Sequence, residues 1–220
     1  MKMGTSAVVQ LTLFLIYAAA PAVPQTLYDN GPINGNSDAW TINLGFVVSD
    51  TFSVASSGTT VSGAQFGMWL FPGDTLTSAE LSITSAENGG TTYFDQTVNF
   101  IQGACTGNQY GFNVCVESTN FAGPTLEAGT YWLNLQNASV PGSDPIYWDE
   151  NSGPSQASQN SVGSIPSESF TVLGAPCGAG PGCGTTTTTT TTTSVPEPSS
   201  IMLVGSGVLA LGSLLRRRLF

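Results

Sequence analysis

Residues 64–71 read Ala-Gln-Phe-Gly-Met-Trp-Leu-Phe, and this stretch decides the fold class. Apolar side chains occupy every second position, which is the period of a half-buried β-strand. The side chains that share this face are Ala64, Phe66, Met68 and Leu70. The turn sequence Pro72-Gly73-Asp74 ends the run. The stretch therefore predicts a strand that turns one face to a hydrophobic core and leaves Trp69 on the opposite face.

The same alternation recurs along the middle of the chain, separated by Gly, Pro, Asn and Asp. Two further alternating series are Tyr110, Phe112, Val114, Val116 and Tyr131, Leu133, Leu135. Other strand candidates are residues 26–29, 39–48, 51–55 and 168–173. Eight or nine short strands with turn residues between them are typical of an antiparallel sandwich. We therefore expect an all-β, jelly-roll-like β-sandwich over residues 23–173, in one domain.

Charge is unusually one-sided. The chain has 220 residues, 14 Asp and Glu, 4 Lys and Arg, and no His, which gives a net charge of −10. The four cations are Lys2, Arg216, Arg217 and Arg218. Between these ends nothing can neutralise phosphates, so nucleic acid is not an expected partner. Catalysis by Ser-His or Cys-His pairs, lysine Schiff bases and histidine-ligated zinc are excluded for the same reason.

The N-terminus resembles a secretory signal peptide. Lys2 precedes an apolar run from Ala7 to Ala20, and Ala20-Pro21-Ala22 offers an A-x-A-like cleavage site. A buried helix or a membrane anchor is the alternative, but the run is short for a span and Pro21 follows it directly. We expect residues 1–22 to be removed by signal peptidase.

The C-terminus combines a Pro-Glu-Pro motif, an apolar segment and a basic end. The segment Ile201–Leu215 contains no charged residue, and Arg216 follows it. With Ser200 it predicts a short transmembrane helix over residues 200–215, whose arginines place the end of the chain in the cytoplasm. The residues of this signal are Val195, Pro196, Glu197, Pro198, Arg216, Arg217 and Arg218.

This arrangement resembles the PEP-CTERM sorting signal of bacterial surface proteins, over residues 195–220. The same segment is also called an ice-binding-protein C-terminal domain, a label that implies no antifreeze activity. The resemblance implies that the tail is held in the inner membrane and processed by an exosortase, with Pro196, Glu197 and Pro198 recognised and the arginines acting as a stop signal. It also implies the cell envelope, surface or extracellular matrix of a Gram-negative bacterium, where exopolysaccharide is a typical associate.

A linker separates the sandwich from this tail. Residues 174–194 contain a Gly/Pro-rich stretch with Cys177 and Cys183, followed by nine consecutive threonines. Such a segment cannot bury a core and is expected to be disordered, with or without O-glycosylation. In an oxidising compartment the simplest pairing joins Cys177 to Cys183 and Cys105 to Cys115, although four cysteines permit three connectivities. A metal site is the alternative, with poor spacing for zinc.

Three kinds of candidate site remain in the middle domain. Trp69, Trp132 and Trp148 are candidates for stacking on sugar rings, against the alternative that they stabilise the sandwich. Asp149 and Glu150 would be the carboxylates of a glycosidase, but adjacent residues of a strand point to opposite faces, so a solvated turn is the favoured interpretation. Acidic side chains could also bind a structural calcium ion, with Asp29, Asp149 and Glu150 as candidate ligands, although no spaced calcium loop is present.

Residues 126–135 and 147–153 are similar to stretches in other PEP-CTERM ectodomains and in carbohydrate-binding sandwich modules. Taken together, the sequence predicts an exported, non-enzymatic protein of the surface or matrix that needs no cofactor. A carbohydrate-binding module for exopolysaccharide is the first alternative, and a carboxylate-only glycosidase is the second.

Overall fold

The computed structural model describes residues 24–176, which form two antiparallel sheets and no helix. The expected signal peptide, the tail and the threonine tract lie outside these residues, as do Cys177 and Cys183. Within residues 24–176, no helix is long and apolar enough to cross a membrane.

Sheet A has eight strands and is organised around β4, the longest strand. Its strands are β1 (Gln25–Asp29), β2 (Ala39–Thr41), β4 (Thr59–Leu70), β7 (Ile101–Gly107), β8 (Asn113–Asn120), β9 (Thr125–Leu126), β11 (Tyr147–Asp149) and β14 (Phe170–Ala175). Strands β8 and β9 pair with β4 along one edge, and β14 and β11 pair with it along the other. β7 extends the sheet beyond β8, β1 beyond β14, and β2 beyond β11.

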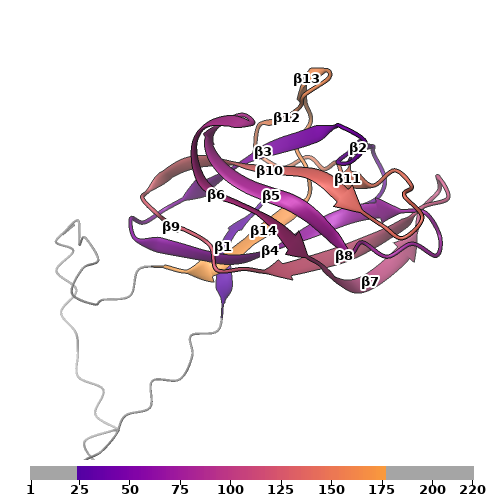
Figure 1. Ribbon diagram of the computed structural model, residues 1–220, viewed down its shortest axis with the longest axis horizontal. Helices are drawn as coiled ribbons and strands as arrows, with labels where there is room; N and C mark the ends of the chain where they lie inside the picture. The colour runs from indigo at the N-terminus through magenta and orange to yellow at the C-terminus, as the bar shows by residue number, and fades with distance from the viewer. Residues whose placement is uncertain (1–23, 177–220) are drawn as a thin grey trace, which may run out of the picture. The chain divides into compact units, whose positions relative to one another are not determined.

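Sheet B has six strands in the order β13-β12-β3-β10-β5-β6. Their bounds are β3 (Val47–Val54), β5 (Ser78–Ala86), β6 (Gly89–Asn99), β10 (Gly129–Ser139), β12 (Ala157–Gln159) and β13 (Gly163–Ile165). Figure 1 shows β3, β10, β5 and β6 layered against β4, β8 and β14 of the other sheet. The chain crosses repeatedly between the sheets; at Phe100, for example, a single residue separates β6 from β7. The predicted antiparallel sandwich is confirmed.

The core lies between the sheets and contains the expected alternating series. Ala64, Phe66, Met68 and Leu70 of β4 have at most 1% of their surface exposed, and Leu133 and Leu135 of β10 face them from sheet B. Edge-to-face contacts join Phe66 to Trp148 at 5.4 Å and Trp148 to Phe170 at 5.5 Å, measured between ring centroids. The apolar alternation is therefore sufficient to predict which face of these two strands is buried.

Three expectations about the strands are wrong. The domain has fourteen strands, because several pairings involve only two or three residues. Residues 39–48 and 51–55 divide instead into β2, a turn around Leu44 and Gly45, and β3. Asp50, expected between strands, lies inside β3 and is fully buried. It stays there because backbone N–H groups of Thr51 and Glu168 donate to its carboxylate at 2.6 and 2.7 Å.

The predicted strand through Tyr110 and Phe112 is also wrong. These residues form the loop between β7 and β8, with Gly111 at φ 86°. In β8 itself the inward side chains are Cys115, Glu117 and Thr119, each at most 1% exposed, while Val114 and Val116 face outward. The valines face residues 33–36 on the outside of sheet A, where both are half-buried, so the outer face of β8 is apolar as well.

Candidate functional site on the outer face of sheet A

The candidate site lies on the outer face of sheet A, where β4 ends. Trp69 lies opposite Val114 of β8 on one side and opposite Tyr147 of β11 on the other. Directly paired residues of antiparallel strands project to the same face. Because Met68 and Leu70 point into the core, Trp69, Val114 and Tyr147 all point outward. The sheet register therefore points Trp69 outward, as the sequence predicts.

Aromatic rings gather around Trp69. The ring of Tyr110 stacks on it, with centroids 5.5 Å apart and an interplanar angle of 20°. Phe112 lies 5.8 Å from Trp69, 5.5 Å from Tyr147 and 4.8 Å from Phe71. We call these five residues, Trp69, Phe71, Tyr110, Phe112 and Tyr147, the outer aromatic cluster.

Part of this cluster is open to solvent. Tyr110 is 52% exposed and Phe71 37% exposed, whereas Trp69, beneath Tyr110, is 5% exposed. A shallow pocket of about 180 Å³ lies between Trp69, Phe112 and Tyr147, with Asp38 at its side. Burial raises the pKa of Tyr147, so its hydroxyl stays neutral and can donate or accept hydrogen bonds. The pocket therefore combines apolar ring faces with polar groups at the edge.

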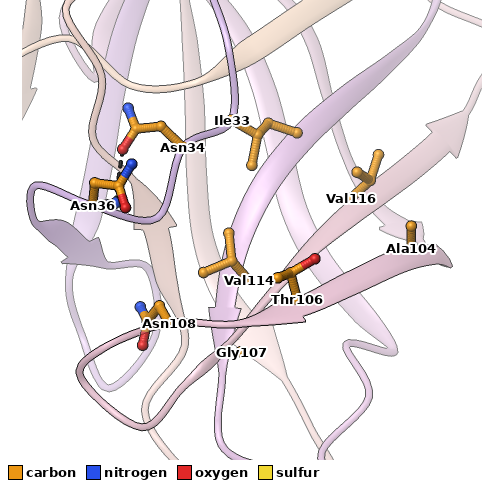
Figure 2. A pocket seen from close by; sticks show the side chains of 9 residues that line it. All are labelled: Ile33, Asn34, Asn36, Ala104, Thr106, Gly107, Asn108, Val114 and Val116. Carbon is orange, nitrogen blue, oxygen red and sulfur yellow. Dashed lines mark hydrogen bonds between the residues drawn. The ribbon is translucent and has the colours of Figure 1, made fainter.

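A second hollow of about 380 Å³ lies beside the cluster (Figure 2). Val114, Val116 and Ile33 supply its apolar surface. The remaining residues that line it are Asn34, Asn36, Ala104, Thr106, Gly107 and Asn108. In Figure 2 the two asparagines of residues 33–36 lie across the hollow from β7, which carries Ala104 and Thr106. Its polar lining in the described structure is thus amide and hydroxyl, without a charged side chain.

The Tyr110 loop joins the two hollows. Asn108 accepts hydrogen bonds at its Oδ1 from the backbone N–H groups of Tyr110 and Phe112, both at 3.0 Å. The Tyr110 hydroxyl donates to the carbonyl of Asn36 at 3.3 Å. These bonds place the Tyr110 ring over Trp69 and beside the asparagine-lined hollow. The sequence Asn108-Gln109-Tyr110-Gly111 carries turn residues, and this signal could have placed the loop correctly.

Asp149 holds the loop that forms one wall of the larger hollow. Its carboxylate accepts hydrogen bonds from the backbone N–H groups of Asn34 and Gly35, both at 3.0 Å, and from the Trp69 indole at 2.6 Å. Gly35 has φ +63° and lies so close to Val114 that a Cβ would be 2.5 Å from Cγ2. The side chain of Asp149 has no exposed surface, so the expectation of a solvated turn at this position is wrong.

The three candidate tryptophans do not share a site. Trp69 belongs to the outer aromatic cluster. Trp132 is half-buried on the outer face of sheet B, where it pairs with Thr51 and Thr84. Trp148 is fully buried in the core, with its indole N–H donating to the carbonyl of Ser169 at 2.9 Å. Since Trp148 has no exposed surface, the expectation that it stacks on a ligand is wrong.

The candidate calcium ligands are likewise separated. Asp29 accepts a hydrogen bond from the N–H of Gly31 at 3.0 Å in an exposed turn. Asp149 is occupied by the three donors described above. Glu150 lies on the other side of its strand, where its Oε2 accepts from the Trp40 indole at 3.1 Å. Among residues 24–176, no three side chains of His, Cys, Asp or Glu converge to hold a metal ion.

The predicted disulfide between Cys105 and Cys115 is confirmed, and it joins β7 to β8. The two Cα atoms are 4.0 Å apart at directly paired positions. Because both residues flank the loop that carries Tyr110 and Phe112, the bridge closes the base of that loop. It therefore limits how far the exposed part of the outer aromatic cluster can move.

Comparison with known proteins finds one match, to the tail of the chain. Residues 194–218 match the family model described as the PEP-CTERM protein-sorting motif. No curated protein and no solved structure matches the chain. The motif supports export, sorting to the cell envelope or surface, and an exosortase as the processing partner. The resemblance of the tail to a PEP-CTERM signal is confirmed.

Proposed function

We propose that this chain is a non-enzymatic polysaccharide-binding protein of the cell surface, and that its sandwich binds neutral glycan chains on the outer face of sheet A. The observation that carries the proposal is the outer aromatic cluster, with Tyr110 half-exposed and stacked on Trp69. Monomeric domains seldom leave grouped apolar side chains in solvent without a binding role.

The chemistry of the face suits sugars. The C–H face of a pyranose ring is apolar and packs on aromatic ring faces, whose π-electrons attract C–H groups. Sugar hydroxyls need neutral donors and acceptors, and the Asn36 amide and the Thr106 hydroxyl can supply both at the neighbouring hollow. A chain that follows this face would meet rings and amides in succession.

The charge of the protein selects against anionic polymers. No Lys, Arg or His occurs between Met3 and Leu215, and the net charge is −10. Uronate or phosphate groups on a polysaccharide would be repelled by this surface. The favoured ligand class is therefore a neutral polysaccharide.

The positions of the acids favour binding without hydrolysis. A general acid or base must reach the proton that it transfers. Asp149 is buried and accepts hydrogen bonds from three donors, and Glu150, which directly follows β11, lies on the opposite face of sheet A. Neither carboxylate has access to a sugar on the outer aromatic cluster. Asp38 is the one acid among the described residues that line its pocket, and hydrolysis needs two, which argues against the glycosidase alternative.

The expected setting is the envelope or extracellular matrix of a Gram-negative bacterium. The supporting feature is the sorting motif at residues 194–218. In this proposal the signal peptide directs export, the apolar segment holds the precursor in the inner membrane, and the exosortase releases it to the surface. The sandwich then contacts exopolysaccharide there.

The test is binding of the full chain, purified in mild detergent, to a panel of neutral polysaccharides and to alginate as an anionic control. Tyr110→Ala removes the exposed ring and should weaken binding about tenfold, equivalent to about 1.4 kcal/mol. The matched control is Trp132→Ala, which removes an aromatic ring from the outer face of sheet B and should change the Kd less than twofold.

Three results would refute the proposal. They are no binding to any neutral polysaccharide, stronger binding to alginate than to the neutral polymers, and equal losses for Tyr110→Ala and Trp132→Ala. Circular dichroism and the melting temperature of both variants show whether each is folded.

A further inference from the structure

A second feature, separate from the outer face, is a polar layer between the two sheets. Asp50 reaches it from β3 of sheet B, and Glu168 from the residues that precede β14 of sheet A. Asn30, which follows β1, lies beside them. All three side chains have no exposed surface. Carboxyl groups in such a position need partners, because burial of a bare charge is costly.

Hydrogen-bond donors in this layer are fewer than the oxygens. Asp50 uses the N–H groups of Thr51 and Glu168, as described above. The Asn30 amide nitrogen lies 2.6 to 3.3 Å from four oxygens, although it carries two hydrogens. Those oxygens belong to Asp50, Ser155, Ser167 and the backbone of Glu168. The hydroxyls of Ser155 and Ser167 also serve Asp50 as donors, so the carboxylate that remains without a donor in this layer is that of Glu168.

Glu168 is the extreme case. Neither of its carboxylate oxygens has a hydrogen-bond partner in the described structure, although both are buried. A β-bridge pairs Glu168 directly with Glu150, which puts the two carboxylates on the same face of sheet A. Burial and the negative charges of Asp50, Glu150, Asp149 and Asp38 raise the pKa of Glu168 well above its ordinary value.

Neutralisation of Glu168 can come from a proton or from a cation. A proton would remove the charge but would leave the carboxyl without a hydrogen-bond donor, since neither oxygen receives a hydrogen bond in the described structure. The sequence provides no Lys, Arg or His between Met3 and Leu215. A bound metal cation would satisfy both oxygens and offset the surrounding negative charge.

We propose that this layer binds a divalent cation of the calcium type, with Glu168 and Glu150 as its carboxylate ligands. Calcium takes six to eight oxygens and accepts neutral oxygens and water beside carboxylates. Two carboxylates with neutral oxygens agree with the finding that no three acidic side chains converge within residues 24–176. Glu168 offers two free oxygens, and Glu150 keeps its Oε2 on Trp40.

This site differs from the calcium ligands expected from the sequence. It omits Asp29 and Asp149, whose carboxylates already accept backbone N–H groups, and it adds Glu168. The cation would join the ends of β11 and β14 through Glu150 and Glu168. Its effect is therefore on stability, and it is independent of the polysaccharide site.

The first test is the melting temperature of the full chain in detergent with CaCl2 and with EGTA. At a Ca²⁺ concentration about 100 times the Kd, we expect a rise of about 5–10 °C over the EGTA sample. Glu168→Gln should abolish this response and leave the EGTA sample at least as stable as the wild type. Glu117→Gln is the matched control. Glu117 is also a buried carboxyl without a hydrogen-bond partner, but its neighbour across the strands is Phe66 and not a second carboxylate. This variant should retain the full response.

The second test measures binding on the wild-type chain and so does not depend on a folded variant. Tb³⁺ emits when a nearby indole is excited, and the Trp40 indole is 3.1 Å from the Glu150 carboxylate. We expect Tb³⁺ luminescence under tryptophan excitation that excess Ca²⁺ removes. Equal melting temperatures in CaCl2 and EGTA, absence of this luminescence, or an undiminished Ca²⁺ response in Glu168→Gln would overturn the proposal.

Discussion

Glu117 provides the sharpest test of how burial acts on this fold. Its side chain points into the core from β8, opposite Phe66 of β4, and has no exposed surface. Neither carboxylate oxygen has a hydrogen-bond partner in the described structure. Burial raises the pKa of Glu117 from 4.5 to about 7. The folded protein therefore holds this proton more tightly than the unfolded chain does.

The direction of the pH dependence follows from this difference. Below pH 4.5 the carboxyl is protonated in both states and costs the fold nothing further. Between pH 4.5 and about 7 the folded state binds more protons than the unfolded state, so the free energy of unfolding decreases as the pH rises. Above about pH 7 the carboxyl is ionised in both states, and the free energy of unfolding decreases no further on its account.

The size of the loss is set by the pKa difference. At about 1.4 kcal/mol per pKa unit, a shift from 4.5 to about 7 corresponds to at most about 3.5 kcal/mol. Glu117 pairs with Gln102 near the exposed β7 edge, so water screens part of the charge. We therefore expect about 1.5–3 kcal/mol.

The variant Glu117→Gln isolates this contribution, because an amide has the shape of the protonated acid and does not titrate. Urea unfolding at constant ionic strength and constant Ca²⁺ should give equal stabilities for the variant and the wild type at pH 4. At pH 8 the variant should be more stable by about 1.5–3 kcal/mol. Burial also raises the pKa of Asp50, to about 6, so the free energy of unfolding of the variant still decreases to some extent as the pH rises.

Glu87→Gln is the control for net charge, since Glu87 lies exposed in the turn between β5 and β6. It should not change the difference between pH 4 and pH 8. If Glu117→Gln loses as much stability as the wild type between these pH values, the carboxyl is not held in an apolar environment and the reasoning fails.

Three other predictions follow from the outer face and from the tail. Asp149→Ala should lower the free energy of unfolding by about 3–5 kcal/mol, measured in urea, because three buried donors lose a charged acceptor; a loss below 1 kcal/mol would contradict the anchoring role. Gly67→Ala should lower the free energy of unfolding by about 1–3 kcal/mol, since a Cβ there would meet the Ser169 hydroxyl and lie 2.8 Å from Ile33 Cγ2. The control is Gly107→Ala, whose Cβ meets nothing within 4 Å, and thermal melting should show no change for it. Replacement of Pro196-Glu197-Pro198 by alanines should leave an uncleaved precursor in the membrane fraction on an immunoblot, and normal processing would contradict the role of this motif.

The sequence predicts the sandwich well where one face of a strand meets the core. In β4 and β10 the inward residues are apolar, whereas the outward residues are a mixture of polar and apolar types. Alternation therefore identifies the face that meets the core. It fails in β8, because the outward residues Val114 and Val116 are apolar and half-buried near residues 33–36, while Glu117 and Thr119 point inward. Alternation identifies the more apolar face of a strand, and in β8 that face is not the one that meets the main core.

The candidate site could be predicted only in part, for a related reason. Trp69 is on the expected face, because its position follows from the β4 alternation. Tyr110 joins it from the loop between β7 and β8, and the contact depends on the long-range pairing of β8 with β4, in which Val114 lies opposite Trp69. Glu150 and Glu168 are 18 positions apart in the chain, and no local pattern indicates that a bridge brings them together.

The direction of β4 has a mechanical consequence. The last residue of β14, Ala175, pairs with Thr60 near the start of β4, and Trp69 lies nine positions further along that strand. At about 3.3 Å per residue, the chain leaves the sandwich roughly 30 Å from the outer aromatic cluster. A polymer that pulls on the cluster against a tether on the C-terminal side would load the β4–β14 hydrogen bonds in shear, all at once, and shear is the direction in which paired strands resist separation most strongly.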